Sequence, residues 1–218
     1  MRADFYLDPA CPWTWTTSRW LCEVSDHRPV TVRWRPYSLL LDDTLADIPL
    51  TRRLELASST RALRVMEAVR DRYGDAPIGE LYTRMGVGFH HDGRREFDHL
   101  PSVLAAMDLD PSIIDALDDP HWDSHIRAAM DEAHLLAGPR AGVPLLAITA
   151  DGPPRAFLGP VFSPAPTGIA ALAAWDGLMT VLAVPGFFEL KRHRTGEPIL
   201  PQRPEVSDGA AVVDLTAG

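Results

Sequence analysis

Apolar and polar side chains recur along the chain with two different periods, and these periods predict its elements. Residues 3–7 form a short apolar run that ends at an Asp-Pro pair, which is typical of a buried strand. Residues 30–37 alternate apolar with polar side chains and predict a second strand. Between them, residues 12–24 carry apolar side chains at helical spacing behind a proline that suits a first helical turn. This order predicts a βαβ unit with a right-handed crossover.

A long region of helical spacing follows the second strand. The predicted helices are residues 63–73, 80–85 and 122–136, with two short helical stretches that open at Pro101 and Pro111. Gly86 is taken as the end of the helix at 80–85, so the GVGFHHDG segment is expected to form a loop.

Strand character returns near the C-terminal end. Residues 143–149 and 155–158 flank an Asp-Gly turn and predict a β-hairpin, and an apolar helix follows at 168–183. The order predicts an α/β fold of the thioredoxin-like type with an inserted helical domain. The predicted units are residues 1–46 with 139–193 as the thioredoxin-like domain, residues 47–138 as the helical insertion, and residues 194–218 as a Pro-rich, mostly unstructured tail.

Composition and charge narrow the class of protein. A chain of 218 residues buries a full core without disulfide staples, and two cysteines are too few for a secreted disulfide framework. A net charge of −9 disfavours nucleic acid as a partner. The apolar stretch 168–188 is interrupted by Asp-Gly and Pro-Gly pairs, which favours a core helix over a membrane span. We therefore expect a cytoplasmic protein with no membrane partner, and a homodimer stays open.

Cys11 is the candidate nucleophile because it stands between the first strand and the first helix. The first turn of a helix presents unpaired N–H groups and a partial positive charge, which favour a thiolate and lower the pKa of the thiol. Trp13 offers a flat apolar surface to an aromatic substrate. A buried, inert cysteine is the alternative. Val143 and Pro144 open the later strand, where a proline is tolerated because no N–H is needed.

Four segments carry a resemblance to a known family. They are ADFYLDPACPWTWTTSRW, ELYTRMGVGFHHDG, FLGPVFSPAPTGIAALAAWD and FFELKRHRTGEP, in that order along the chain. Together they resemble the mycothiol-dependent nitroreductase group of DsbA-like thioredoxin-fold proteins. The resemblance implies a cytosolic reductase that uses mycothiol as cosubstrate, with no flavin and no metal. It implies that Cys11 is the first active-site cysteine, Pro12 and Trp13 its Pro-Trp pair, and Pro144 a cis-proline whose preceding residue, Val143, is free to pair with substrate.

The sequence departs from this family pattern at one position. Thr14 stands where the Cys-Pro-Trp-Cys motif has its resolving cysteine. Cys22 cannot replace it, since it lies about 16 Å further along the helix, whereas a disulfide requires Cα atoms within about 7 Å. An intramolecular dithiol cycle is therefore excluded.

Three interpretations remain with a single thiol. In the first, Cys11 runs a monothiol redox cycle in which mycothiol resolves a mixed disulfide and reduces a small molecule or a disulfide. In the second, the site is a mycothiol-dependent S-transferase or isomerase for a small electrophile, and Thr14 donates a hydrogen bond to a thiolate. In the third, the protein binds without catalysing.

Other side chains give weaker indications. His90 is expected to line the pocket and shuttle a proton, or else to be exposed in a loop. Tyr82 is expected to help form a lid over Trp13, or to belong to the core of the insertion. A basic run that includes Arg192 and Arg194 fits a solvated face, or alternatively meets an anionic substrate. No metal site is predicted, because the paired histidines at 121 and 125 lack a third ligand.

Overall fold

A four-stranded sheet forms the centre of the computed structural model, which describes residues 1–42, 49–139 and 141–206. Its strands are β1 (Arg2–Leu7), β2 (Thr31–Pro36), β3 (Leu145–Thr149) and β4 (Arg155–Leu158), in the order β2-β1-β3-β4. β1 runs parallel to β2 and antiparallel to β3, and β3 pairs antiparallel with β4. The predicted βαβ unit and hairpin are both present, which confirms the thioredoxin-like class.

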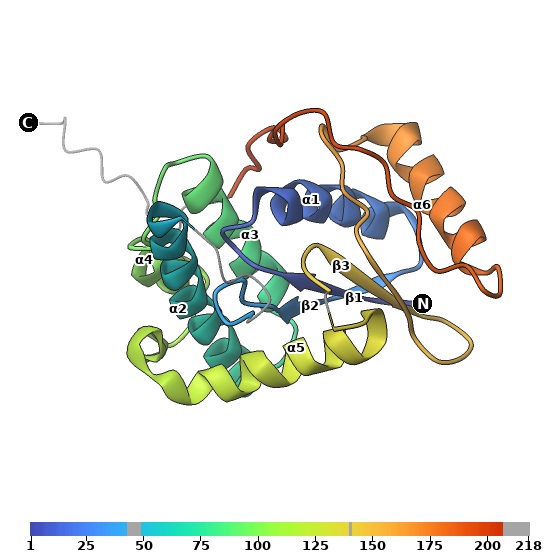
Figure 1. The fold of residues 1–218 in the computed structure, drawn as a ribbon. Helices are drawn as coiled ribbons and strands as arrows, with labels where there is room; N and C mark the ends of the chain where they lie inside the picture. Colours follow the sequence, from blue (N-terminus) through green and yellow to red (C-terminus); the bar gives the residue numbers. More distant parts are fainter. Residues whose placement is uncertain (43–48, 140, 207–218) are drawn as a thin grey trace, which may run out of the picture.

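Helices cover both faces of this sheet. α1 (Pro12–His27) and α6 (Gly168–Leu182) pack against each other above the sheet in Figure 1, and α5 (Asp123–Ala137) crosses below it. α5 contacts both β2 and β4. The C-terminal helix of the predicted insertion therefore also closes the core of the thioredoxin-like unit.

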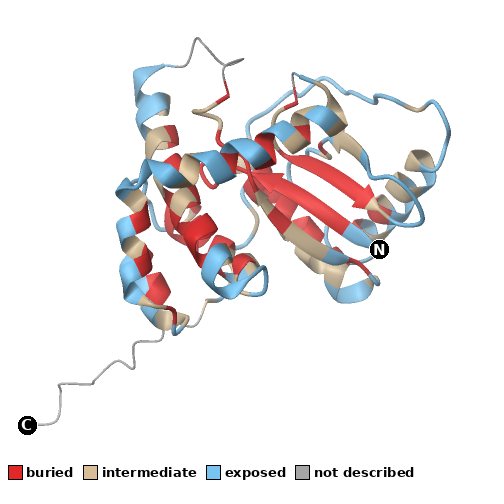
Figure 2. Cartoon of the chain, turned by 90° about the horizontal axis from the view of Figure 1, so that it is seen from below, coloured by how far each residue is buried: buried red, intermediate tan, exposed pale blue. Residues whose placement is uncertain are grey.

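The remaining helices of the insertion stand at one end of the sheet. They are α2 (Leu50–Tyr73), α3 (Ile78–His90) and α4 (Leu100–Ala106), followed by the short 3-10 helices η1 (Pro111–Asp118) and η2 (Pro120–Trp122). Their inward faces are buried and their outward faces exposed (Figure 2). The core runs without a break from the strands into the insertion.

The predicted end of a helix at Gly86 is wrong, because α3 continues to His90. Gly86 allows the Trp15 ring to pack closely against α3, because an added Cβ would lie 2.1 Å from a carbon of that ring. Gly88 meets the His99 ring at the same distance. Both glycines let an aromatic ring rest directly on the helix backbone, a use that a local sequence pattern does not distinguish from a helix stop.

Residues 183–206, here called the C-terminal arm, form neither helix nor strand but follow a defined path. The Ser163 hydroxyl donates to the carbonyl of Glu197 (3.0 Å) and accepts from the N–H of Ile199 (2.8 Å). Further along, Arg203 pairs with Asp92 through two hydrogen bonds of 3.0 Å. The arm thus links the loop after β4 to the end of α3. The sequence predicted a mostly unstructured tail from residue 194 and did not predict these contacts. Residues 207–218 of that tail lie outside the described residues.

No helix in the described ranges is long and apolar enough to cross a membrane.

Candidate active site

Cys11 occupies the N-cap of α1, directly after the turn that leaves β1. Its N–H donates to the carbonyl of Asp8 (3.0 Å), and its own carbonyl accepts from the N–H of Trp15 (3.0 Å). Pro12 fills the first helical position, where its missing N–H costs nothing. The backbone around the thiol is therefore fixed on both sides. Only 5% of Cys11 is exposed.

The electrostatic balance at Cys11 differs from the sequence expectation. Burial raises the pKa of the Cys11 thiol, because the thiolate loses its solvation. The hydroxyl and backbone N–H of Thr14 lower the pKa, as does the positive charge of Arg52. The position of Cys11 at a helix N-terminus had indicated a net lowering, and the structure corrects this: desolvation is the largest effect, so the resting group is a neutral thiol.

Thr14 faces Cys11 from the third position of the helix and is fully buried. Its hydroxyl completes no hydrogen bond with any described residue. No side-chain hydrogen bond caps the helix at Cys11 either. A buried hydroxyl without a partner carries a desolvation cost of about 1–3 kcal/mol. A negative charge on the neighbouring sulfur would offset that cost.

Asp8 is a buried carboxyl beneath the active-site turn, and the sequence reasoning did not identify it as a site residue. Its oxygens accept hydrogen bonds from the N–H groups of Ala10 and Leu39, both at 2.9 Å, and from the hydroxyl of Ser59. Burial nevertheless raises the pKa of Asp8. Through Leu39 these contacts join the turn to the loop after β2, and through Ser59 they join it to α2. The Asp-Pro pair after an apolar strand was the available sequence signal, and it was interpreted only as a strand end.

Arg52 holds the same turn from the outside. Its guanidinium donates to the carbonyl of Ala10 (3.1 Å) and pairs with Glu55 (2.9 Å). The insertion thus reaches the Cys11 turn through α2 and brings a positive charge close to Cys11.

His90 and Tyr82 lie beneath the site rather than at its surface. His90 is 8% exposed, and its Nε2–H donates to the carbonyl of Pro9 (2.9 Å). Burial lowers the pKa of His90 to about 3, so it is neutral at physiological pH and holds the turn instead of shuttling a proton. Tyr82 is 0% exposed and packs edge-on against Trp15 at 5.8 Å between ring centroids. It belongs to the core and not to a lid over Trp13.

Trp15 joins these groups into one aromatic cluster. Its ring stacks on His90 at 5.4 Å, and its Nε1–H donates to Nε2 of His91 (3.1 Å). The guanidinium of Arg19 lies over the same ring, 4.2 Å from its centroid. The N-terminal turns of α1 are therefore locked to α3, which positions Cys11 relative to the insertion.

Pro144 lies at the same end of the sheet as the Cys11 turn. The register pairs Tyr6 with Leu145, which brings Pro144 next to the residue that ends β1. The Val143–Pro144 peptide bond is cis, and the Pro144 carbonyl accepts from the N–H of Gly159 (2.7 Å). Val143 is partly exposed beside it. The Cys11 turn and the Val143–Pro144 segment, which the sequence predicted to meet, thus lie at one end of the two central strands.

Trp13 is partly exposed at the surface next to Cys11, and a residue of the arm covers it. The guanidinium carbon of Arg194 lies 5.1 Å from the centroid of the Trp13 ring. This contact was not predicted, because nothing in the local pattern ties the end of the chain to the first helix.

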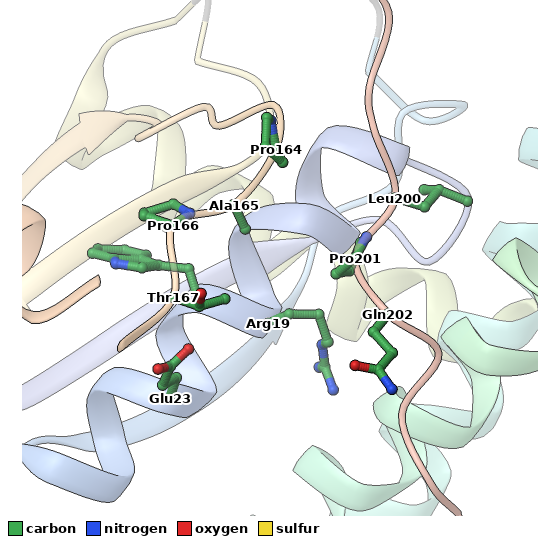
Figure 3. A pocket seen from close by; sticks show the side chains of 10 residues that line it. Arg19, Glu23, Pro164, Ala165, Pro166, Thr167, Leu200, Pro201 and Gln202 are labelled. Atoms are coloured by element: carbon green, nitrogen blue, oxygen red, sulfur yellow. The ribbon is translucent and has the colours of Figure 1, made fainter. Parts of the chain in front are cut away.

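The hollow drawn in Figure 3 is separate from Cys11. It measures about 390 Å³ and lies between α1, the loop at 164–167 and the arm at 200–202, with Gln202 beside Arg19. Neither Cys11 nor Trp13 lines it. Across the residues described, there is no group of three or more His, Cys, Asp or Glu side chains that could hold a metal ion.

Residues 10–192 match a family model described as Rv2466c-like, mycothiol-dependent nitroreductase Rv2466c. The chain belongs to this family. It is 29% identical over 223 residues to the uncharacterized protein Rv2286c of Mycobacterium tuberculosis, a comparison that covers 99% of this chain and 93% of that protein. The family places the chain among thiol-dependent oxidoreductases.

Solved structures agree on the DsbA-like fold. The cytosolic disulfide reductase DsbM from Pseudomonas aeruginosa aligns with a TM-score of 0.54 and 17% identity, covering 72% of this chain and 89% of that one. A 2-hydroxychromene-2-carboxylate isomerase aligns with a TM-score of 0.53 and 16% identity, covering 83% of this chain and 95% of that one.

Proposed function

We propose that this family member is a mycothiol-dependent reductase that works through one cysteine. The observation that carries the proposal is the position of Cys11: it caps α1, faces Thr14 instead of a second thiol, and lies at the end of the sheet that also holds Val143 and Pro144. Membership of a mycothiol-dependent family supplies the thiol partner. A cytoplasmic location and a homodimer stay predictions.

The cycle balances with two molecules of mycothiol for each disulfide reduced. The Cys11 thiolate attacks one sulfur of the substrate disulfide, forms a mixed disulfide and releases the first substrate thiol. A mycothiol thiolate then attacks the Cys11 sulfur, releases the second substrate thiol and leaves Cys11 linked to mycothiol. A second mycothiol attacks the mycothiol sulfur of that bond. The products are mycothiol disulfide, two substrate thiols and regenerated Cys11.

Each neighbouring group has a role in this scheme. Thr14 stabilises the thiolate with its otherwise unpartnered hydroxyl, and Arg52 adds a positive charge. The backbone at Val143, ahead of Pro144, pairs with the bound thiol, and Trp13 forms the apolar wall beside the sulfur. Pro12 fixes the direction of the first helical turn. Asp8, His90 and Tyr82 hold the turn and the helix from below.

A second function is favoured by the buried hydroxyl of Thr14. A hydroxyl that faces the site without a partner also suits an S-transferase or isomerase. In such an enzyme the hydroxyl would stabilise the thiolate of bound mycothiol, and no mixed disulfide with Cys11 would form. The structural likeness to a 2-hydroxychromene-2-carboxylate isomerase is compatible with this alternative. A purely binding role would require that Cys11 take no part in any reaction.

Mass spectrometry of the intact protein with mycothiol disulfide tests the proposal. We expect one mycothiol adduct on Cys11, removed by excess mycothiol, and no adduct on a Cys11→Ser variant. Cys22→Ser is the matched control and should leave the adduct unchanged. Turnover of a small electrophile that survives Cys11→Ser would overturn the single-cysteine cycle in favour of the transferase or isomerase.

A Thr14→Cys variant gives an independent check of the site geometry. It should form an internal disulfide on oxidation, seen as a loss of about 2 Da, because positions 11 and 14 lie within one helical turn. If Cys11 is alkylated as readily in the oxidised variant as in the reduced one, the two positions do not face each other.

A further inference from the structure

We infer that Arg194 binds substrate and selects compounds that join a flat aromatic ring to a carboxylate. This inference rests on the proposed function in that it assigns the substrate class of the same site. It starts from the contact between Arg194 and Trp13, which brings a residue from the end of the chain to the wall beside Cys11.

The charge of Arg194 is available to a ligand. The residue is exposed, and among the described residues its recorded contact is with the Trp13 ring alone, with no carboxylate within ion-pair distance. A guanidinium over an indole face is a modest interaction at an exposed position, worth about 0.5–1 kcal/mol. A substrate ring that takes over the Trp13 face can therefore displace it at low cost.

Hydrogen bonds anchor the chain at the end of α6, before Arg194, and in the arm after it. Before it, the guanidinium of Arg155 donates to the carbonyl of Leu182 at the end of α6 (2.5 Å). After it, Ser163 binds the backbone of Glu197 and Ile199. Arg194 thus lies in a segment that is anchored at both ends, and its exposed side chain reaches the Trp13 ring.

The charges around Trp13 and the Cys11 turn favour an anion. The arm carries Lys191 and Arg192 close to Arg194 in the sequence, together with Glu189 and Glu197. Asp8 beneath the turn is buried with a raised pKa, and Glu55 is paired with Arg52. In a chain with a net charge of −9, the guanidinium of Arg194 on the Trp13 ring is a local positive charge that attracts an anionic ligand.

The chemistry of the two side chains defines the ligand. An indole face stacks on a flat aromatic ring, and a guanidinium binds a carboxylate through two parallel N–H donors. A ring stacked on Trp13 with its carboxylate on Arg194 is placed at the first turn of α1, two residues after Cys11. Neutral aromatic compounds make only the first contact and should bind less tightly.

Equilibrium binding of two matched probes, 2-naphthoate and 2-naphthamide, tests this inference by calorimetry on the full chain. We expect wild type to bind the carboxylate about fivefold to tenfold tighter than the amide, as a charge-assisted hydrogen-bond pair provides. Arg194→Gln should abolish that preference. The matched control Arg192→Gln removes the same charge from the same arm and should retain it.

The result that overturns the inference is equal affinity of wild type for both probes, or an equal loss of preference in the Arg192 and Arg194 variants. Protection of Cys11 from iodoacetamide by 2-naphthoate, and its absence with Arg194→Gln, places the bound probe at the active site. These measurements involve no turnover, so a failure of the single-cysteine cycle leaves them interpretable. A mycothiol adduct on Cys11 without any carboxylate preference would conversely refute the substrate class alone.

Discussion

Replacing Gly86 with alanine should destabilise the protein, although alanine is the better helix former. Gly86 lies inside α3, and an added Cβ would lie 2.1, 2.4 and 2.9 Å from three ring carbons of Trp15. Trp15 is 0% exposed, and its ring contacts both the His90 ring and the Arg19 guanidinium. The ring would have to move by about 1.5 Å to reach ordinary van der Waals contact, and its neighbours leave no space for that.

The magnitude follows from two opposing effects. Overpacking of a filled core costs about 1–3 kcal/mol, and a rigid ring on a rigid helix belongs at the upper end of that range. The gain in helix propensity from glycine to alanine recovers about 1 kcal/mol. We expect a net loss of about 2 kcal/mol in the free energy of unfolding, which lowers Tm by about 4–8 °C for a chain of this size.

Gly177→Ala is the matched control for this substitution. Gly177 also lies within a helix, α6, but an added Cβ meets no atom within 4 Å. The same chemical change should therefore stabilise the protein by about 0.5–1 kcal/mol. Urea denaturation and thermal melts of both variants measure the difference. If Gly86→Ala is as stable as Gly177→Ala, the close packing of α3 on Trp15 is refuted.

Three further predictions concern the site. The pKa of His90 is about 3 in the folded protein and about 6.5 in the unfolded chain, so the unfolded state takes up the proton first as the pH falls. The free energy of unfolding of wild type should therefore fall by up to about 2 kcal/mol between pH 7 and pH 5, and His90→Gln should remove this fall. Urea midpoints that depend on pH equally in both proteins would contradict this. Ser59→Ala should cost about 1–3 kcal/mol by urea denaturation, because it removes a buried donor to Asp8, and a neutral result would refute the role of that contact. In a Cys22→Ser background, alkylation of Cys11 by iodoacetamide should be half-maximal above the usual thiol pKa of about 8.5, since burial raises its pKa. Half-maximal reactivity below pH 7 would show that the helix terminus outweighs desolvation.

The sequence predicted those features that repeat with a regular period. The strands, the helix behind Pro12 and the hairpin at 145–158 follow from alternation, helical spacing and turn residues, and their order defined the fold. Cys11 and Thr14 could be proposed as the candidate site because they form a short motif between a strand and a helix, and the structure has both at the start of α1. Such signals are contained within a few neighbouring residues.

The features that were missed depend on contacts between distant segments. Gly86 looks like a helix stop until Trp15, from another helix, is placed against it. His90 reads as a loop residue, either lining the pocket or exposed, whereas the structure buries it at the end of α3 with its ring bonded to the Pro9 carbonyl. The contact of Arg194 with Trp13 joins opposite ends of the chain, and no local pattern encodes it. Burial, which raises the pKa of Cys11, is a property of the whole fold.

The raised pKa of Cys11 and the unpartnered hydroxyl of Thr14 together indicate how a single-cysteine site can be reactive. A thiolate of higher pKa is the stronger nucleophile once formed, although less of it is present. Thr14 has no competing partner among the described residues, so its hydroxyl is available when the sulfur becomes charged. Burial keeps the resting thiol neutral, and the hydroxyl reduces the cost of ionising it when substrate arrives. A second cysteine at this position would instead trap the site as an internal disulfide, whereas threonine leaves the mixed disulfide to be resolved by a thiol from solution.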